Sequence, residues 1–224
     1  GPGLADFTTN WAVGFGLLPP GTGYVSVRAF DVAGGSTTAT DLFLVRKDTV
    51  VPTVQDNQAG ETTWRRLDPG AMYDVDFADA GGSLLSFAQY TAWTGAAQTG
   101  TQVVPWTDVA TGISSSAYTT NWAVNFALLD SGTNYITVRA VDVAGSTTTV
   151  DDVFVVLKDT TLPSVTDLQA GDAAWRRADP GAIYDVDFAD TGGSFLDRAE
   201  YAVYTATGLG GVNVKPWAFI ATGI

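Results

Sequence analysis

The amino-acid sequence predicts an all-β chain of antiparallel β-sandwiches that repeat in tandem, with a period of about 110 residues given by the spacing of Trp11 and Trp122. Three observations support this prediction. Short stretches alternate apolar and polar residues with a period of two, which is typical of half-buried strands. Clusters of turn-forming residues separate these stretches roughly every 8–12 residues, as in two-layer β domains. Tryptophans and their neighbours recur at a constant interval, and no stretch shows sustained helical periodicity.

The repeat is visible without gaps over almost the whole chain. Residues 7–113 align with residues 118–224, and more than half of the aligned pairs are identical. Three of the recurring pairs are tryptophans, namely Trp11/Trp122, Trp64/Trp175 and Trp106/Trp217. This period is longer than the roughly 20–50 residues of solenoid repeats, so it indicates whole domains joined in tandem.

Five stretches carry the strand prediction. In "YDVDFAD" (73–79), Tyr73, Val75 and Phe77 alternate with Asp74 and Asp76, which predicts an apolar inner face and an acidic outer face. The other predicted strands are "WAVNFALL" (122–129), "YITVRAVD" (135–142), "VFVVLKD" (153–159) and "AEYAVYT" (199–205). Turn sequences lie between them: "DPG" at 68–70 and 179–181, "GGS" at 81–83 and 192–194, "SGTN" at 131–134 and "VAGS" at 143–146.

The domain boundaries are predicted from a recurring linker, "KDTVVPTV" (47–54) and "KDTTLPSV" (158–165). Each copy follows an apolar strand and contains a proline, which cannot donate to a strand ladder and marks domain junctions. We therefore expect a complete repeat at 52–162, the C-terminal half of a repeat at 4–51 and the N-terminal half of a repeat at 163–224. The alternative register divides the chain into 4–113 and 114–224.

Two segments resemble a known family. "LLDSGTNYITVRAVDVAGSTTTVDDVFVVLKDTTLPSV" (128–165) is similar to the closing half of bacterial immunoglobulin-like repeats, and "YDVDFADTGGSFLDRAEYAVY" (184–204) is similar to their first half. The resemblance implies tandem immunoglobulin-like sandwiches from large bacterial cell-surface or secreted proteins. The family's usual Asn after Ala-Gly is replaced by Gly35 and Ser146.

Composition excludes several classes of function. The chain has no cysteine and no histidine, which removes disulfides, Ser-His and Cys-His catalytic pairs and ordinary zinc sites. A net charge of −13 repels phosphate backbones, so nucleic-acid binding is not expected. No apolar run reaches the roughly 18–20 residues of a membrane span. Nothing in the sequence suggests a catalytic cleft, and the acidic motif recurs in each repeat, whereas catalytic sites rarely recur in every unit of an array; we therefore predict that the protein is not an enzyme.

The repeated aspartates are candidate metal ligands. Asp74, Asp76 and Asp79, with Asp185, Asp187 and Asp190 in the second copy, offer the oxygen ligands that calcium prefers, although they lack EF-hand spacing. The competing interpretation is a solvated outer face, with Asp79 capping a turn. No cofactor other than calcium is expected.

The motif "WRR" before "DPG" is a candidate contact surface. Trp64, Arg65 and Arg66, and their counterparts Trp175, Arg176 and Arg177, could form an inter-domain interface or stack a ligand. The alternative is a structural Arg–Trp packing near the turn. Separately, Asp31 and Asp142 precede "VAG" and are predicted to accept hydrogen bonds from turn N–H groups.

These observations lead to two functional hypotheses. The first is a structural segment of a bacterial extracellular shaft, adhesin stalk or surface filament, whose partners are neighbouring copies of the repeat or of the chain. In this hypothesis the incomplete halves 163–224 and 4–51 of successive chains could complete one another head to tail. The second is a carbohydrate-binding or adhesive module that uses exposed Trp and Arg against glycans or a host or cell surface.

Overall fold

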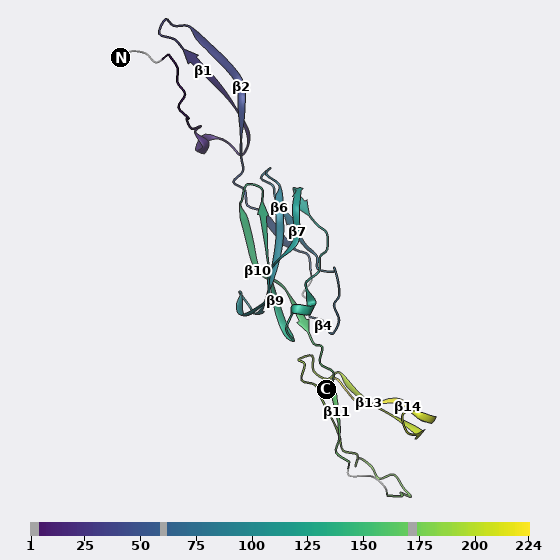
Figure 1. Cartoon of the computed structure of the whole chain (residues 1–224). Coiled ribbons are helices and arrows are strands. Elements are labelled where there is room, and N and C mark those ends of the chain that lie inside the picture. The colour runs from purple at the N-terminus through teal and green to yellow at the C-terminus, as the bar shows by residue number, and fades with distance from the viewer. Residues whose placement is uncertain (1–4, 59–61, 170–173) are drawn as a thin grey trace.

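A computed structural model describes residues 5–58, 62–169 and 174–224 of the chain. The molecule is elongated: the β1–β2 hairpin lies at one end, strands β6 to β10 lie in the middle, and β11 to β14 lie at the other end (Figure 1). The described residues form strands, turns and two single turns of 3₁₀ helix, so the chain is all-β with several sheets. No helix among them is long and apolar enough to cross a membrane.

The N-terminal part is a hairpin. A 3₁₀ turn, η1 (Phe15–Leu17), precedes β1 (Gly21–Phe30) and β2 (Ser36–Lys47), which pair antiparallel with a bulge between Val25 and Val27. The hairpin turn is closed by Asp31, whose Oδ1 accepts a hydrogen bond of 2.7 Å from the Gly35 N–H.

The middle part contains two sheets. The smaller sheet has the order β3-β5-β8 and the larger has the order β4-β10-β9-β6-β7. Their strands are β3 (Thr53–Asp56), β4 (Trp64–Arg65), β5 (Val75–Ala78), β6 (Leu85–Gly95), β7 (Thr99–Ser115), β8 (Ala117–Tyr118), β9 (Gly132–Asp142) and β10 (Thr147–Lys158). All neighbouring strands here run antiparallel except β4 and β10, which run parallel.

One hydrophobic core, which we call the central core, joins these two sheets. The predicted alternation in 73–79 is confirmed, because Tyr73, Val75 and Phe77 are buried while Asp74 and Asp76 are half-exposed. Aromatic rings form the centre of the core: the ring centroids of Tyr73 and Phe154 lie 4.7 Å apart in a stacked arrangement. The full set of buried core residues is Tyr73, Val75, Phe77, Leu85, Ala88, Tyr90, Ala92, Val104, Trp122, Val124, Phe126, Leu129, Ile136, Val138, Ala140, Phe154 and Val156.

The predicted strand at 122–129 is wrong. Trp122 makes only an isolated bridge to Tyr73, and a 3₁₀ turn, η2 (Phe126–Leu128), follows it. The carbonyl groups that a strand would have paired are satisfied by a side chain, because Lys158 Nζ donates to the oxygens of Phe126 (3.0 Å) and Leu129 (2.6 Å). The apolar residues of this stretch therefore enter the core from an irregular segment.

The C-terminal part forms two separate hairpins. They are β11 (Ser164–Asp167) with β12 (Val186–Ala189), and β13 (Arg198–Ala206) with β14 (Gly210–Thr222). The β13–β14 hairpin points away from β11 (Figure 1). Strand positions also follow the repeat: shifted by the interval between Trp11 and Trp122, β2, β3 and β5 have the same bounds as β10, β11 and β12.

Candidate cation site at the junction after β2

Three aspartates from distant parts of the chain meet where β2 leads into the central core. One carboxylate oxygen from each of Asp48, Asp79 and Asp142 lies within 4.8 Å of the corresponding oxygens of the other two. Asp79 and Asp142 are buried, and Asp48 is half-exposed. This is the one such group of metal-ligating side chains found among residues 5–58, 62–169 and 174–224.

Each buried carboxylate is held by backbone N–H groups. Asp79 follows β5, and its two oxygens accept hydrogen bonds from the N–H groups of Gly81 (3.1 Å) and Leu84 (3.0 Å). Asp142 ends β9, and its Oδ1 accepts from the Ser146 N–H at 2.8 Å. These contacts fix the two carboxylates in tight loops.

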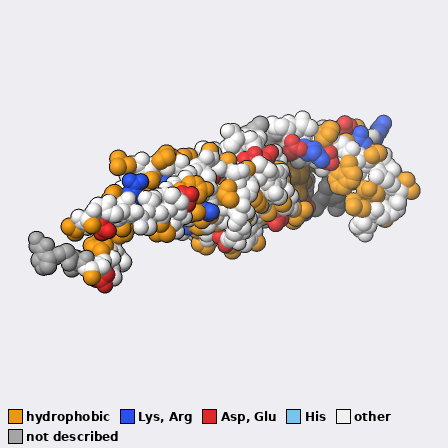
Figure 2. Space-filling view, turned by 90° about the horizontal axis from the view of Figure 1, so that it is seen from above, with side chains coloured by type: hydrophobic (Ala, Val, Ile, Leu, Met, Phe, Trp, Pro, Cys, Tyr) orange, Lys and Arg blue, Asp and Glu red, His pale blue; other side chains and the backbone are white. Residues whose placement is uncertain are grey.

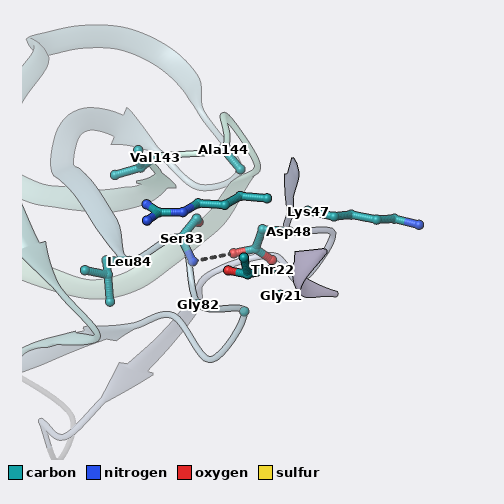
Figure 3. A pocket seen from close by; sticks show the side chains of 11 residues that line it. Gly21, Thr22, Lys47, Asp48, Gly82, Ser83, Leu84, Val143 and Ala144 are labelled. Atoms are coloured by element: carbon teal, nitrogen blue, oxygen red, sulfur yellow. Dashed lines mark hydrogen bonds between the residues drawn. The ribbon is translucent and has the colours of Figure 1, made fainter. Parts of the chain in front are cut away.

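Asp48 reaches the same place from the other side of the junction. Its Oδ2 accepts a hydrogen bond from the Ser83 N–H (2.8 Å), and its Oδ1 accepts from the Val50 N–H (2.9 Å). Figure 3 shows the Asp48 carboxylate directed at Ser83, while Lys47 points away from it. A cavity of about 390 Å³ adjoins this contact and is lined by residues of β2, of the 81–84 loop and of the 143–144 turn.

The first glycine of the "GGS" loop allows the aspartate carboxylate to approach the loop backbone closely. A β-carbon on Gly81 would overlap the Asp48 carboxylate, and one on Gly192 would overlap the carboxylate of Asp159 in the same way. Any larger residue would displace the aspartate from its hydrogen bonds. The recurring glycine therefore allows the aspartate that follows β2 or β10 to approach the next "GGS" loop.

The second junction reproduces two of the three acids. Asp159 Oδ2 accepts a hydrogen bond from the Ser194 N–H (3.0 Å), and Asp190 Oδ1 accepts from the Gly192 N–H (3.3 Å). The arrangement around Asp48 is thus a property of the repeat and not of one loop.

An unsatisfied oxygen at the first junction indicates that a cation fits there. Asp142 Oδ2 is buried and has no hydrogen-bond partner. Three carboxylates within 4.8 Å repel one another by at least about 3 kcal/mol per pair at an effective dielectric constant of about 20. A divalent cation would relieve this repulsion, and an all-oxygen donor set suits calcium, which accepts irregular geometry.

Hydrogen bonding also favours the ionised form of Asp48 and of Asp159. The hydrogen bonds from Ser83 and then from the Val50 N–H hold the pKa of Asp48 below its ordinary value. Hydrogen bonding from Ser194 lowers the pKa of Asp159 in the same way. Both groups therefore present negative charge at neutral pH.

The structure separates the aspartates that the sequence grouped as calcium ligands. Asp79 joins the junction group, whereas Asp74 and Asp76 share the side-chain amide of Asn57, at 3.4 and 2.9 Å. In the second copy Asp190 lies at the junction, and Asp185 and Asp187 are exposed. Asp79 caps the turn after β5, as the competing interpretation expected, but it does so from a buried position and not from a solvated face.

The "WRR" motif lies at the following junction. A β-carbon on Gly193 would lie 3.1 Å from Cη2 of Trp64, so the Trp64 indole packs on the next "GGS" loop. Arg65 extends β4, and its carbonyl oxygen accepts a hydrogen bond of 3.0 Å from the Asp159 N–H. Arg66 follows β4 and is exposed; the counterparts Trp175, Arg176 and Arg177 are exposed as well.

Sequence reasoning missed two members of the junction group. In the sequence Asp48 is one residue of the linker at 47–54, and Asp142 is predicted only to cap a turn. The available signal was recurrence, because Asp48 and Asp142 both have aspartate counterparts, Asp159 and Asp31. Their proximity to Asp79 depends on the strand arrangement and is not visible in the linear spacing.

No family model matches the chain, and comparison with curated proteins found no match.

Proposed function

We propose that this chain is a structural spacer made of immunoglobulin-like β-sandwich repeats in a bacterial extracellular shaft, adhesin stalk or surface filament. The observation that carries the proposal is a complete two-sheet core flanked on both sides by strands of the same kind. Its role is mechanical rather than catalytic. Each core is stabilised independently, and the junctions determine the length and stiffness of the array.

The strand pairing supports the repeat boundary at 52–162 over the alternative at 113/114. Strand β6 pairs with β9 over eight residue pairs, from Leu85↔Asp142 to Trp93↔Tyr135. The alternative boundary lies between these strands and would divide one sheet between two domains. In the preferred register, 4–51 and 163–224 are the two halves of neighbouring repeats.

The junctions supply the stiffness that a spacer requires. Asp48 and Asp159 dock on the following "GGS" loops, and Trp64 packs on Gly193. We propose that calcium binds Asp48, Asp79 and Asp142, with the buried Asp142 Oδ2 as a ligand. Because Asp48 belongs to the preceding repeat, a bound ion would tie two repeats together.

The experiment is negative-stain microscopy and small-angle X-ray scattering of the purified chain, with calcium and with a chelator. We expect rod-like particles, whose junctions bend over a wider range of angles after chelation. A compact globular particle would contradict the spacer. Rod-like particles whose flexibility and melting temperature do not change with calcium would contradict only the cation site.

The alternative function, carbohydrate binding through exposed Trp and Arg, has less support. In the central core Trp122 is buried, Trp106 lies under Arg139 with the guanidinium carbon 4.4 Å from the ring centroid, and Trp64 packs on Gly193. Trp11 and Trp217 are partly exposed, and Trp175, which is fully exposed, is the tryptophan most accessible to a sugar ring. Glycan-array binding that disappears in Trp175→Ala would support this alternative over the spacer.

A further inference from the structure

The two ends of the molecule carry complementary parts of one repeat. β1, β2 and η1 are the counterparts of β9, β10 and η2, and β11 to β14 are the counterparts of β3, β5, β6 and β7. In the central core these two sets pack on each other and share one hydrophobic interior. Among the described residues, neither end has the other set packed on it.

Each end therefore exposes residues that the central core buries. Tyr73 is 1% exposed and its counterpart Tyr184 is 64% exposed; Trp122 is 4% exposed and its counterpart Trp11 is 57% exposed. Figure 2 shows hydrophobic side chains on the surface towards both ends of the molecule. At the C-terminal end they line a groove of about 930 Å³, which includes Tyr184, Val186, Tyr201, Val203 and Trp217.

The pairing of β6 with β9 gives the register in which the two ends would join. Shifted by the repeat, Tyr90↔Val138 becomes Tyr201 opposite Val27 with both residue types unchanged. Ala92↔Ile136 becomes Val203 opposite Val25, so a larger residue on β13 faces a smaller one on β1. The summed side-chain volume at this position is nearly conserved, as close packing requires.

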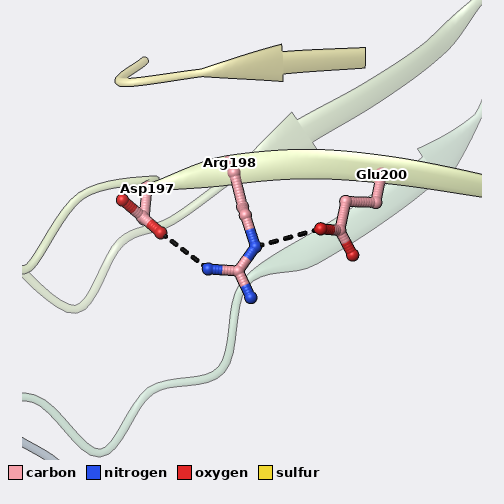
Figure 4. Close-up of polar contacts among 3 residues, drawn as sticks. All are labelled: Asp197, Arg198 and Glu200. Atoms are coloured by element: carbon pink, nitrogen blue, oxygen red, sulfur yellow. Dashed lines mark hydrogen bonds and ion pairs between the residues drawn. The ribbon is translucent and has the colours of Figure 1, made fainter. Parts of the chain in front are cut away.

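Charge complementarity supports the same register. In the central core Arg139 donates a hydrogen bond of 2.8 Å from Nε to Gln89 Oε1. The counterparts of these residues are Arg28 and Glu200, so the neutral acceptor is replaced by a carboxylate opposite an arginine. Glu200 now accepts from Arg198 of its own strand at 3.2 Å, on an open surface (Figure 4).

Trp217 completes this polar contact. Its counterpart Trp106 lies under the guanidinium of Arg139, whereas Trp217 is 58% exposed. In the joined register Arg28 would lie over Trp217 and face Glu200, giving a cation–π contact and an ion pair on one arginine.

The two ends of this chain cannot complete one another within a single molecule, because they lie at opposite ends of an elongated particle (Figure 1). We propose that the C-terminal half-repeat of one chain binds the N-terminal half-repeat of a second copy of this chain, with β13 pairing antiparallel to β1. This inference rests on the proposed repeat architecture. The contact uses two different surfaces, so it is head-to-tail and adds further copies at both ends.

The experiment is sedimentation velocity of the full chain with aspartate placed on either face. Val203→Asp alters the C-terminal face and Val27→Asp alters the N-terminal face, and each variant alone is expected to lose self-association. In a mixture of the two variants, the C-terminal groove of V27D and the N-terminal β1–β2 hairpin of V203D are both unaltered. These two faces can still bind each other. We expect the mixture to form dimers and nothing larger.

The controls are valine-to-aspartate substitutions at positions that would stay exposed to solvent in the joined register. Val212→Asp and Val32→Asp qualify, because the counterpart of Val212 is the exposed Thr101 and that of Val32 is the exposed Val143. Both controls are expected to assemble as the unaltered chain does. The dimer also shows that each variant keeps its unaltered half competent to bind.

Three outcomes would overturn the inference: an unaltered chain that stays monomeric over a wide concentration range, association that persists in both V203D and V27D, or a mixture that remains monomeric. A monomeric chain whose central core still melts cooperatively would remove the assembly and leave the spacer intact. Loss of cooperative melting would instead count against the repeat architecture itself.

Discussion

The sharpest test of the architecture compares the same substitution at two positions related by the repeat. Phe154 is 6% exposed, and its ring centroid lies 4.7 Å from that of Tyr73 and 5.7 Å from that of Trp122. Its counterpart Phe43 is 41% exposed, and its ring centroid lies 6.1 Å from that of Trp11. Phe154→Ala opens a cavity among buried rings, whereas Phe43→Ala removes atoms already in contact with water.

Truncating a buried phenylalanine costs about 3–5 kcal/mol in free energy of unfolding. For a unit of about 100 residues, each kcal/mol shifts the melting temperature by about 4–8 °C, so F154A is expected to lower it by more than about 10 °C. We expect F43A to cost under about 1 kcal/mol, since surface changes rarely exceed this. Both are measured by calorimetry and near-ultraviolet circular dichroism in the V203D background, in which we expect the chain to be monomeric.

Equal losses of stability for the two variants would refute this reasoning, because they would mean that both phenylalanines lie in equivalent cores within one chain. A neutral F154A would refute the central core itself. In chains free to assemble, F43A should also weaken association, since the joined register would bury Phe43 as the core buries Phe154.

Three further predictions concern polar groups. Calcium at about 100 times its dissociation constant should raise the free energy of unfolding by about 2.7 kcal/mol in a thermal melt; Asp142→Asn should abolish this gain while Asp74→Asn keeps it, and equal responses would exclude the site. The lowered pKa of Asp159 means that its stabilising contribution is complete above the ordinary value of 3.8 and is lost as the pH falls through its folded-state pKa. Proteolysis of the unaltered chain at this junction should therefore accelerate only in acid. The Asp159→Asn variant should be cleaved at neutral pH as fast as the unaltered chain is cleaved in acid. Asn134→Ala should cost about 1–3 kcal/mol, because its buried amide bonds Asp130 N–H and O and the Val156 carbonyl oxygen, and a neutral result would contradict that network.

Local patterns were sufficient for much of the strand assignment. The strict alternation around Tyr73, the apolar run at 153–159 and the turn residues between them depend on neighbours in the sequence, and these strands are present. The stretch 122–129 was misassigned because an apolar run is equally compatible with an irregular segment whose carbonyls are bonded by a distant lysine. The parallel pairing of β4 with β10 had no local signal, since it joins residues far apart in the chain.

The candidate site shows the same division. That the aspartates recur could be read directly, and so could their preference for calcium as oxygen donors. Which aspartates meet could not be read, because Asp48, Asp79 and Asp142 come from three separate strand ends, while the nearby Asp74 and Asp76 turn towards Asn57.

The sequence by itself determined the all-β character, the strand alternation and the interval of the repeat, because side-chain periodicity and recurrence are properties of the linear chain. Only the tertiary structure decided which carboxylates share a site, why glycine is required opposite Asp48 and Asp159, and which of two identical phenylalanines is buried. Those outcomes depend on long-range packing. Two phenylalanines in similar local sequences differ in burial, and so in their contribution to the free energy of unfolding, when a second sheet packs against only one of them.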